Sequence, residues 1–390
     1  MYVMGEEEIQ AVRRVIESRQ LFRYQGENAS ETDRFEQEWA AKVGAKYALA
    51  LTSGTASLIC ALAGLGVGPG DEVIVPGYTF IATALAPLAV GAVPVIAEVD
   101  ESLTLDPLDV EAKITPRTKA ILPVHMNGLP CNMEAIMDIA ARHELKVIED
   151  ACQADGGSYR GRRLGSIGDA GGFSFNYFKI ISCGEGGAMV TDDEEVYERA
   201  ILHHDGGCVF FREKGPQHLP IFAGGSYRFN EISAAILRVQ LSRLDGILAD
   251  LRADKRRLRE GLAGATGFTF NPVNDLDGDC GVTLSLLLES AEQAAGFVTR
   301  ANEAGVPCGS PINSGRHVYS NWEAIMTQRG SHNEGLNPFR SGECDWVYAP
   351  DMCPQTLDVL ARTVNVGTNP ARTEAEAAAA IEALRQAARG

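Results

Sequence analysis

One lysine, Lys179, lies in a setting that favours a reactive amine. Its neighbours in the sequence include Phe173, Phe175, Tyr177 and Phe178. Burial of an ammonium group disfavours its charged form, which leaves a neutral amine near neutral pH. Such an amine forms a Schiff base with a carbonyl compound. Because lysines beside apolar residues often extend their charged ends into water, this stretch alone leaves both interpretations open.

Two short apolar runs flank this lysine. Residues 172–175 and 187–191 have the composition of buried strands, and glycines punctuate the interval between them. We therefore expect Lys179 to lie on an irregular connection between two strands.

A second group of residues, Ser53, Gly54 and Thr55, follows an apolar run and opens a helical pattern. The free amides at a helix N-terminus bind phosphate, so this segment is a candidate anion site. The alternative is a plain helix cap made by Thr52 or Ser53.

These residues require a scaffold, and the chain between 47 and 149 alternates strand and helix patterns. Strands are predicted at 47–51, 72–75, 93–99, 120–124 and 145–149, with helices at 55–65, 79–90 and 132–143. This alternation predicts an α/β fold with a mostly parallel sheet covered by helices on both faces. Ligands of such sheets bind at the carboxyl ends of the strands, where the candidate residues fall.

The remaining patterns extend this scaffold on both sides. Helices are predicted at 6–18, 30–44, 232–244 and 252–262, followed by a strand at 282–288 and helices at 291–304 and 373–388. We expect a large domain over residues 1–247 and a smaller C-terminal α+β domain over 248–390. Packing of the N-terminal helix on the small domain is left open.

Composition excludes several classes of partner. The net charge of −17 argues against binding to nucleic acid or an anionic membrane. The nine cysteines are odd in number and form no Cys-x-x-Cys motif, so neither a disulfide framework nor a metal site is expected. The N-terminus lacks the features of a signal peptide and no apolar run reaches the length of a membrane span, so we expect a cytoplasmic protein.

The motifs occur in a specific order: Thr-Ser-Gly-Thr-Ala at 52–56, Pro-Gly-Tyr-Thr-Phe at 76–80, Glu-Asp-Ala-Cys-Gln-Ala at 149–154, Lys179, and Gly-Glu-Gly-Gly at 184–187. This succession resembles the DegT/DnrJ/EryC1/StrS family of pyridoxal-phosphate (PLP) enzymes, the sugar aminotransferases of the aspartate-aminotransferase fold (fold type I). The resemblance is dense over residues 5–245 and weak beyond them.

The resemblance implies PLP as cofactor and transfer of an amino group from glutamate or glutamine to a small-molecule keto acceptor. That acceptor would be a keto-sugar, nucleotide-linked or free, or a keto-cyclitol, in amino-sugar or natural-product biosynthesis. The family also implies a homodimer with active sites at the subunit interface. Alternatives are a dehydratase of the same family, whose members replace this lysine with histidine, and a PLP-binding regulatory protein with little turnover.

Carried over to this chain, the resemblance makes Lys179 the Schiff-base lysine and Asp150 the partner of the pyridine nitrogen. It places Gln153 against the ring hydroxyl, Phe80 against the ring face and Ser174 on the phosphate, beside Ser53, Gly54 and Thr55. Without the resemblance, Phe80 would be a core residue and Ser174 a buried hydroxyl bonded to backbone.

Two further regions contain candidate site residues. Ser226 stands where the family has an asparagine that reaches the phosphate of the neighbouring subunit, which leaves that contact in doubt. The stretch 316–340 concentrates arginine, histidine and aromatic residues without periodicity. It is either a surface loop or a substrate-binding region, with Tyr78, Arg316, His317 and Tyr319 as candidate substrate ligands.

Overall fold

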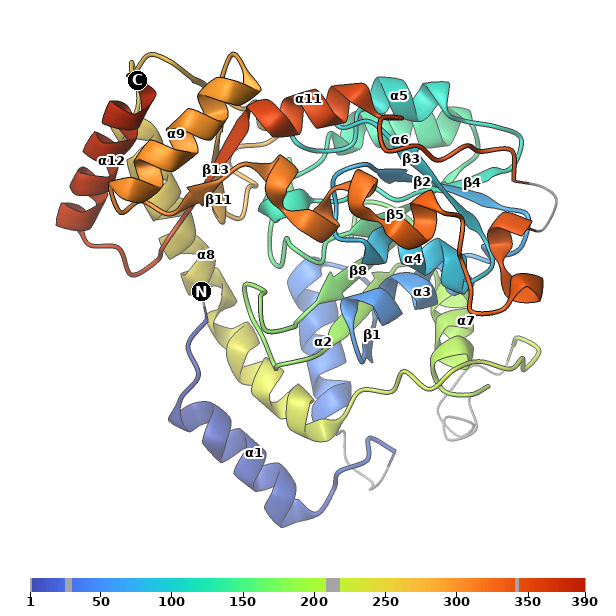
Figure 1. The fold of residues 1–390 in the computed structure, drawn as a ribbon. Coiled ribbons are helices and arrows are strands. Elements are labelled where there is room, and N and C mark those ends of the chain that lie inside the picture. Colours follow the sequence, from blue (N-terminus) through green and yellow to red (C-terminus); the bar gives the residue numbers. More distant parts are fainter. Residues whose placement is uncertain (1, 25–29, 208–217, 341–343, 390) are drawn as a thin grey trace.

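The computed structural model describes residues 2–24, 30–207, 218–340 and 344–389 of the 390-residue chain. A large sheet with its helices and a smaller C-terminal sheet lie side by side, and one long helix, α8, connects them (Figure 1). No helix in the described ranges has the length and apolar character needed to cross a membrane.

Seven strands form the large sheet, in the order β1-β9-β8-β5-β4-β2-β3. Only β9 runs antiparallel to its neighbours, so the predicted mostly parallel sheet is confirmed. Its strands are β1 (Tyr47–Leu51), β2 (Glu72–Pro76), β3 (Val93–Ala97), β4 (Thr118–Ile121), β5 (Lys146–Asp150), β8 (Ala170–Ser174) and β9 (Gly187–Thr191). A two-stranded hairpin, β6 (Ser158–Tyr159) and β7 (Arg162–Arg163), follows β5.

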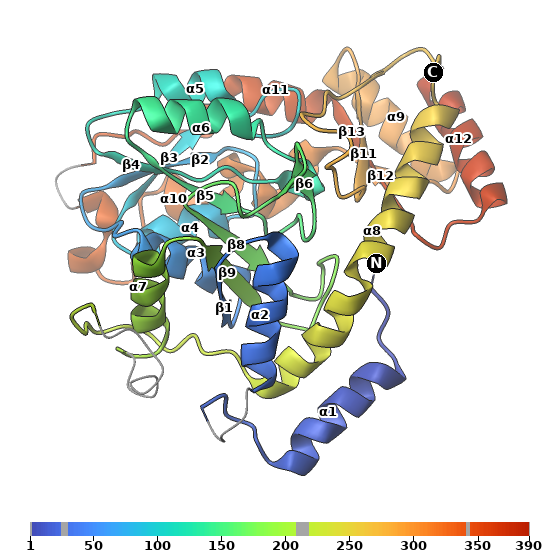
Figure 2. The same ribbon diagram turned by 180° about the vertical axis from the view of Figure 1, so that it is seen from behind.

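Helices cover both faces of this sheet because successive strand residues point to opposite sides. Val73 and Val75 join one core, and Ile74 joins the other. The first core includes α3 (Gly54–Gly64), α4 (Ala82–Ala89) and α7 (Glu194–His204). The second, seen from behind in Figure 2, includes α2 (Glu31–Val43), α5 (Pro107–Ala112), α6 (Met133–Arg142) and part of α8.

Helix α2 shows how the local sequence defines its element. Phe35, Trp39 and Val43 recur every four residues, and all three are buried against the sheet. The Ser30 hydroxyl caps the N-terminus by accepting from the Asp33 N–H group, and Gly44 ends the helix with a positive φ of 77°. Both predicted ends are confirmed.

Helix α8 (Glu231–Gly261) is one continuous helix of 31 residues. The sequence predicted two helices, at 232–244 and 252–262, so this prediction is wrong. Leu244, Leu248 and Leu251 continue the buried stripe across the interval. A Cβ at Gly246 would meet nothing within 4 Å, so this glycine faces open space. The predicted domain boundary at 247 therefore falls inside a helix that both sheets share.

The smaller C-terminal unit is an antiparallel sheet of order β10-β11-β13-β12. Its strands are β10 (Thr269–Phe270), β11 (Thr283–Leu287), β12 (Cys308–Gly309) and β13 (Thr363–Gly367). Its core includes α9 (Ala291–Glu303), α12 (Glu374–Ala388) and the end of α8, as predicted for an α+β unit. Helix α11 (Pro354–Arg362) precedes β13.

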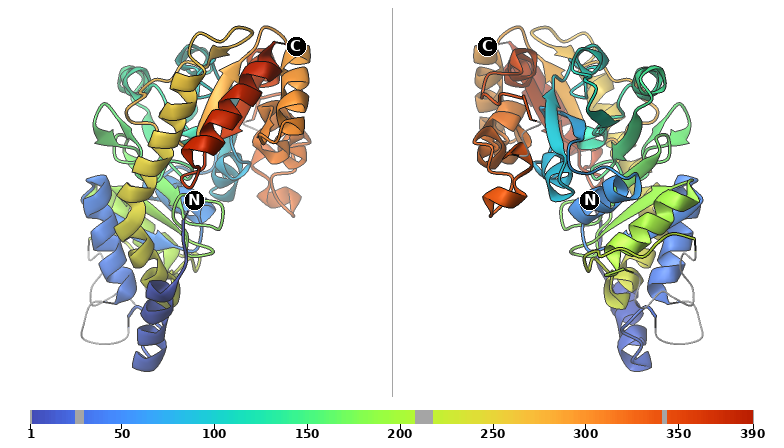
Figure 3. Two further views of the ribbon diagram at one scale, coloured as in Figure 1. Left: turned by 90° about the vertical axis from the view of Figure 1, so that its left-hand side faces the viewer. Right: turned by 90° about the vertical axis from the view of Figure 1, so that its right-hand side faces the viewer.

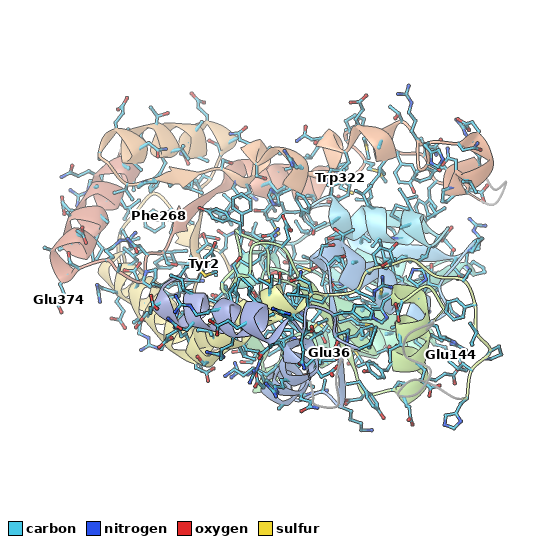
Figure 4. The ribbon with its side chains drawn as sticks, turned by 90° about the horizontal axis from the view of Figure 1, so that it is seen from below. Tyr2, Glu36, Glu144, Phe268, Trp322 and Glu374 are labelled. Atoms are coloured by element: carbon cyan, nitrogen blue, oxygen red, sulfur yellow. The ribbon has the colours of Figure 1, made fainter. Side chains whose placement is uncertain are left out.

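Residues 311–340 leave the small sheet and pack on the large one. The segment forms short helices: η2 (Pro311–Asn313), η3 (Gly315–His317), η4 (Tyr319–Asn321), α10 (Glu323–Met326), η5 (Glu334–Leu336) and η6 (Pro338–Arg340). Tyr319 and Trp322 are fully buried in the core of the large sheet, and Figure 4 labels Trp322 between the ribbon of this segment and the helices of the large sheet. Because both side chains are buried, the segment is more than a surface loop.

The N-terminal helix α1 (Glu6–Ser18) extends at one end of the molecule (Figure 3). Ala11 and Val15 pack against Ala235 of α8, with Ile232 and Val239 beside them. The helix therefore lies on the large-sheet end of α8.

Candidate active site

Two cavities occur at the carboxyl edge of the large sheet. An inner cavity of about 230 Å³ is lined by residues of the predicted cofactor site, including Ser53, Gly54, Thr55, Phe80, Asp150, Gln153, Ser174 and Lys179. An outer cavity of about 670 Å³ shares Phe80, Gln153, Asn176 and Lys179 with it. Lys179 thus lies where a cofactor in one space would meet a substrate in the other.

Lys179 occupies the connection between β8 and β9, as predicted, and is half-buried. Its aromatic neighbours do not enclose it in this chain. Tyr177 and Phe178 are 67% and 77% exposed. Phe173 and Phe175 instead pack edge-on against Trp39, with ring centroids 4.9 and 5.0 Å apart. The expectation that these aromatic neighbours bury the Lys179 amine is therefore wrong for the single chain.

The start of α3 forms an anion cradle. The Ser53 hydroxyl caps the helix by accepting from the Ala56 N–H group at 3.1 Å. The N–H groups of Gly54 and Thr55 make no hydrogen bond within the described residues, and neither does the Ser174 hydroxyl. A Cβ at Gly54 would lie 2.7 Å from the Ser174 Cβ, so only glycine permits this approach. The three donors suit a phosphate group.

Asp150 ends β5 and faces the inner cavity. Its carboxylate accepts from the Cys152 N–H group at 3.0 Å and from the Thr83 hydroxyl at 2.7 Å. The Thr79 and Thr83 oxygens are 2.7 Å apart. Since the Thr83 proton is directed to the carboxylate, Thr79 donates to Thr83. The sequence analysis did not predict that these two threonines support Asp150, although their spacing of four residues after a strand was an indication.

Gln153 is oriented by its carbonyl oxygen, which accepts from the Asn127 N–H group at 3.1 Å. Its Nε2 group has no partner in the described ranges and remains available as a donor in both cavities. The Asn127 side chain donates to the Tyr78 hydroxyl at 3.3 Å. Tyr78 is buried outside both cavities, and burial raises its pKa to about 12. It therefore supports Asn127 in place of the predicted contact with substrate.

Residues 315–319 run antiparallel to residues 77–81, more than 230 positions earlier in the chain. The N–H groups of Thr79 and Ile81 donate to the carbonyls of His317 and Arg316, at 2.9 and 3.2 Å. This pairing keeps Thr79 and Phe80 out of the helix, so α4 begins at Ala82 and not at the predicted residue 79. It also brings Arg316 and His317 to the outer cavity.

Phe80 and His317 form one wall of the site. Phe80 is 38% exposed, and its ring centroid lies 5.6 Å from that of His317. Burial lowers the pKa of His317, and the charges of Lys179 and Arg316 lower it further. Its Nδ1 group donates to the Ser314 carbonyl at 3.2 Å, which leaves Nε2 as an acceptor. A neutral His317 can accept a hydrogen bond from a hydroxyl group.

Tyr319 lies outside both cavities. Its hydroxyl donates to the Pro350 carbonyl at 2.8 Å and accepts from the Cys353 N–H group at 2.9 Å. This fully buried side chain holds the segment in place and does not make the predicted substrate contact. Ser226 is exposed, forms a backbone bridge with Asp205 and lines neither cavity of its own chain. Its cross-subunit role stays a prediction.

A further carboxyl group, on Asp155, was not predicted. Asp155 is fully buried two residues after Gln153, and neither of its oxygens has a hydrogen-bond partner in the described part of the chain. Burial raises its pKa well above the usual range, while the charge of Lys179 opposes this shift. Burial therefore favours the protonated form of this carboxyl group.

The arrangement fits PLP. The α3 cradle offers three donors to a phosphate, Asp150 offers a carboxylate to a protonated ring nitrogen, Phe80 offers a flat face, and Lys179 offers an amine. Among the described residues, no group of three His, Cys, Asp or Glu side chains could hold a metal ion. The fold and site are those of a PLP-dependent enzyme.

Comparison with known proteins defines this class further. The model of the DegT/DnrJ/EryC1/StrS aminotransferase family matches residues 3–324. The chain is 37% identical over 350 residues to 3-amino-5-hydroxybenzoate synthase of Amycolatopsis mediterranei, covering 86% of this chain and 87% of that protein. It is 44% identical over 251 residues to dTDP-3-amino-3,4,6-trideoxy-alpha-D-glucose transaminase of Streptomyces venezuelae, covering 64% of each.

A crystal structure of 3-amino-5-hydroxybenzoic acid synthase superposes with a TM-score of 0.81 at 32% identity, over 99% of this chain and 97% of that one. The protein belongs to the DegT/DnrJ/EryC1/StrS aminotransferase family. It is a PLP-dependent aminotransferase.

Proposed function

We propose that this enzyme transfers an amino group from glutamate or glutamine to a hydroxylated ketone, a keto-sugar or keto-cyclitol, in amino-sugar or natural-product biosynthesis. The observation that carries the proposal is the position of Lys179 between an inner cavity that fits PLP and a larger outer cavity. Relatives named for a dTDP-sugar and for 3-amino-5-hydroxybenzoate support an acceptor that is a ring carrying polar substituents.

Each residue then has a defined task. Bound PLP supplies an electron sink for the carbon that carries the amine. Gly54, Thr55 and Ser174 bind its phosphate, while Asp150 keeps its ring nitrogen protonated. Lys179 would hold the cofactor through its amine and would move a proton as general base and acid at the carbon that carries the amine. Gln153 donates to the ring hydroxyl.

The outer cavity supports a polar acceptor. Its lining combines the faces of Phe80 and Phe178 with donors and acceptors on Asn127, Asn176 and His317. A sugar or cyclitol ring presents apolar C–H faces and hydroxyl edges, which such a lining binds.

We also propose a homodimer with Ser226 of each chain at the phosphate of the other. The exposed aromatic side chains of Tyr177 and Phe178 beside Lys179 support an interface at this position. The expected result of light scattering is a mass twice that of the chain, and a monomer that retains cofactor and turns over would contradict the proposal.

We further propose two domains and a cytoplasmic location. The division into residues 1–247 and 248–390 is supported by the two separate sheets, with α8 shared between them. A cytoplasmic location is supported by the free thiols of the eight cysteines in the described ranges.

An absorption spectrum of the purified protein tests the activity. We expect a visible band from lysine-linked PLP that shifts when glutamate or glutamine is added. Lys179→Ala should abolish the band while leaving the fold intact by circular dichroism. A band that persists in this variant would overturn the assignment of Lys179, and a wild-type band that responds to neither donor would contradict the proposed amino transfer.

A further inference from the structure

The charges that line the outer cavity differ from those of the molecule as a whole. The chain carries a net charge of −17, yet no Asp or Glu is among the described residues that line this cavity. Its basic side chains are Lys179, Arg316 and His317, and burial lowers the pKa of His317. The cavity is therefore built to receive an anionic group.

The fold fixes the backbone of Arg316 and leaves its side chain free. The Arg316 carbonyl accepts from the Trp322 indole N–H at 2.8 Å and from the Ile81 N–H group at 3.2 Å. Trp322 is fully buried, so this attachment is rigid. The exposed guanidinium makes no hydrogen bond or ion pair with any described residue. By contrast, Arg238 binds Glu31 and Glu38 through its guanidinium.

The two cations are not equally available to a substrate. In the loaded enzyme the amine of Lys179 is occupied by the cofactor, so Arg316 is the remaining permanent cation of the described lining. A donor amino acid brings a carboxylate into this space, and a desolvated carboxylate requires a charged or hydrogen-bonding partner. A guanidinium meets both carboxylate oxygens with parallel N–H groups.

We propose that Arg316 binds a carboxylate of the amino donor and thereby selects amino acids as donors. This inference rests on the proposed amino transfer and adds the residue that recognises the donor. The acceptor uses the same cavity after the keto acid has left, so the cation serves the two substrates in turn.

Arg316 also lines a neighbouring groove of about 570 Å³, together with Glu323 and Arg329. It makes no ion pair with Glu323 in the described structure. Arg329 lines this groove and not the outer cavity, which makes it a matched control for a nearby exposed arginine.

The test uses the loaded enzyme and two readouts. In the first, the absorption change caused by glutamate is recorded over a range of concentrations for wild type, Arg316→Gln, Arg316→Lys and Arg329→Gln. Loss of a charged hydrogen bond should raise the half-saturating glutamate concentration of Arg316→Gln about 10- to 100-fold, with a smaller rise for Arg316→Lys. Arg329→Gln should match wild type.

The second readout does not require turnover. Glutarate, a dicarboxylate without an amine, should raise the melting temperature of the wild type and of Arg329→Gln more than that of Arg316→Gln. The role of Arg316 would be overturned if wild type and Arg316→Gln had the same half-saturating glutamate concentration. It would also be overturned if this concentration rose as much in Arg329→Gln as in Arg316→Gln. A wild type that binds glutarate through Arg316 but is aminated by no amino acid would instead contradict the proposed donor.

Discussion

At the scale of single residues, the neighbouring carboxylates Glu149 and Asp150 have opposite roles. Glu149 is fully buried and accepts from the N–H groups of Gly165, Ile167 and Gly168, at 2.5 to 2.8 Å, with His125 Nε2 at 3.0 Å. Asp150 points to the other face of the strand and keeps capacity for a further partner. The first is structural, and the second is available to a cofactor.

Thr83 is predicted to position Asp150. Thr83→Val keeps the shape of the side chain and removes its hydrogen bond to the carboxylate. A lost charge-assisted bond of about 1.5–3 kcal/mol should slow the glutamate half-reaction roughly 10-fold or more at saturation. Stopped-flow absorbance measures this rate. Thr79→Val, which acts only through Thr83, should have a smaller effect, and an unchanged rate in Thr83→Val would show that Asp150 is held by other contacts.

Asp155 is predicted to make stability depend on pH. Its pKa is raised in the folded chain, so the folded state binds the proton more tightly than the unfolded state does. Its contribution to the free energy of unfolding is therefore fully present below the pKa of the unfolded state. This contribution is lost as the pH rises above that pKa, by about 1.4 kcal/mol per pH unit. Asp155→Asn should gain stability relative to wild type as the pH rises above the pKa of the unfolded state.

Denaturant unfolding of the apoenzyme at several pH values provides the measurement for Asp155. A difference between wild type and Asp155→Asn that stays constant with pH would mean that Asp155 does not titrate on unfolding. Because asparagine is neutral at every pH, the pH dependence of the Asp155→Asn variant comes from the remaining groups. The difference between wild type and variant therefore reports on Asp155.

At the scale of elements, β8, β9 and the start of α3 meet more closely than side chains allow. A Cβ at Gly187 would lie 2.3 Å from the Ser53 carbonyl oxygen, and one at Gly54 would lie 2.8 Å from the Cys152 Sγ. Glycine at both positions lets the helix N-terminus approach the end of β8. The anion cradle is thus a product of strand and helix packing.

Gly54→Ala is predicted to disrupt this cradle. The added methyl group displaces Ser174 and Cys152, and overpacking of this kind costs about 1–3 kcal/mol. We expect at least a 10-fold rise in the PLP dissociation constant, measured by fluorescence titration of the apoenzyme. Gly309→Ala in β12 is the control, because a Cβ there meets nothing within 4 Å. Equal PLP affinity in both variants would argue against a phosphate at this helix.

At the scale of the whole molecule, the outer cavity draws on distant parts of the chain. Asn127 and Lys179 come from loops of the large sheet, Val282 precedes β11 of the small sheet, and Arg316 lies on the segment that returns to the large one. Relative movement of the two sheets would therefore change the substrate space.

Subunit mixing is predicted to reveal which subunit supplies the Ser226 that contacts each phosphate. Ser226→Ala should weaken PLP retention a few-fold, as expected for one hydrogen bond of about 1 kcal/mol. A hybrid dimer combines one Lys179→Ala chain with one Ser226→Ala chain. The chain with an intact lysine then lacks its own serine, so its site receives an intact Ser226 only if this residue comes from the other subunit. Wild-type retention of the lysine-linked band in the hybrid is expected, and weakened retention would place Ser226 in its own site.

Local patterns predicted most elements of the fold. The strands of the large sheet and helix α2 follow from residues within one turn or one strand, and their bounds agree with the structure within a few residues. The errors occur where distant contacts override the local pattern. Residues 79–81 pair with the segment after residue 314, and the leucines of α8 extend one helix over two sheets.

The sequence by itself indicated the class of the protein, because the ordered motifs around residues 53–55, Asp150 and Lys179 resemble those of the DegT/DnrJ/EryC1/StrS family. Only the tertiary structure decided which side chains join them. Thr83 binds Asp150 from helix α4, Arg316 reaches the cavity while Tyr319 turns into the core, and Asp155 is buried without a hydrogen-bond partner among the described residues. These outcomes depend on contacts between residues far apart in the chain. The periodicity of a segment indicates only which of its own residues share a face.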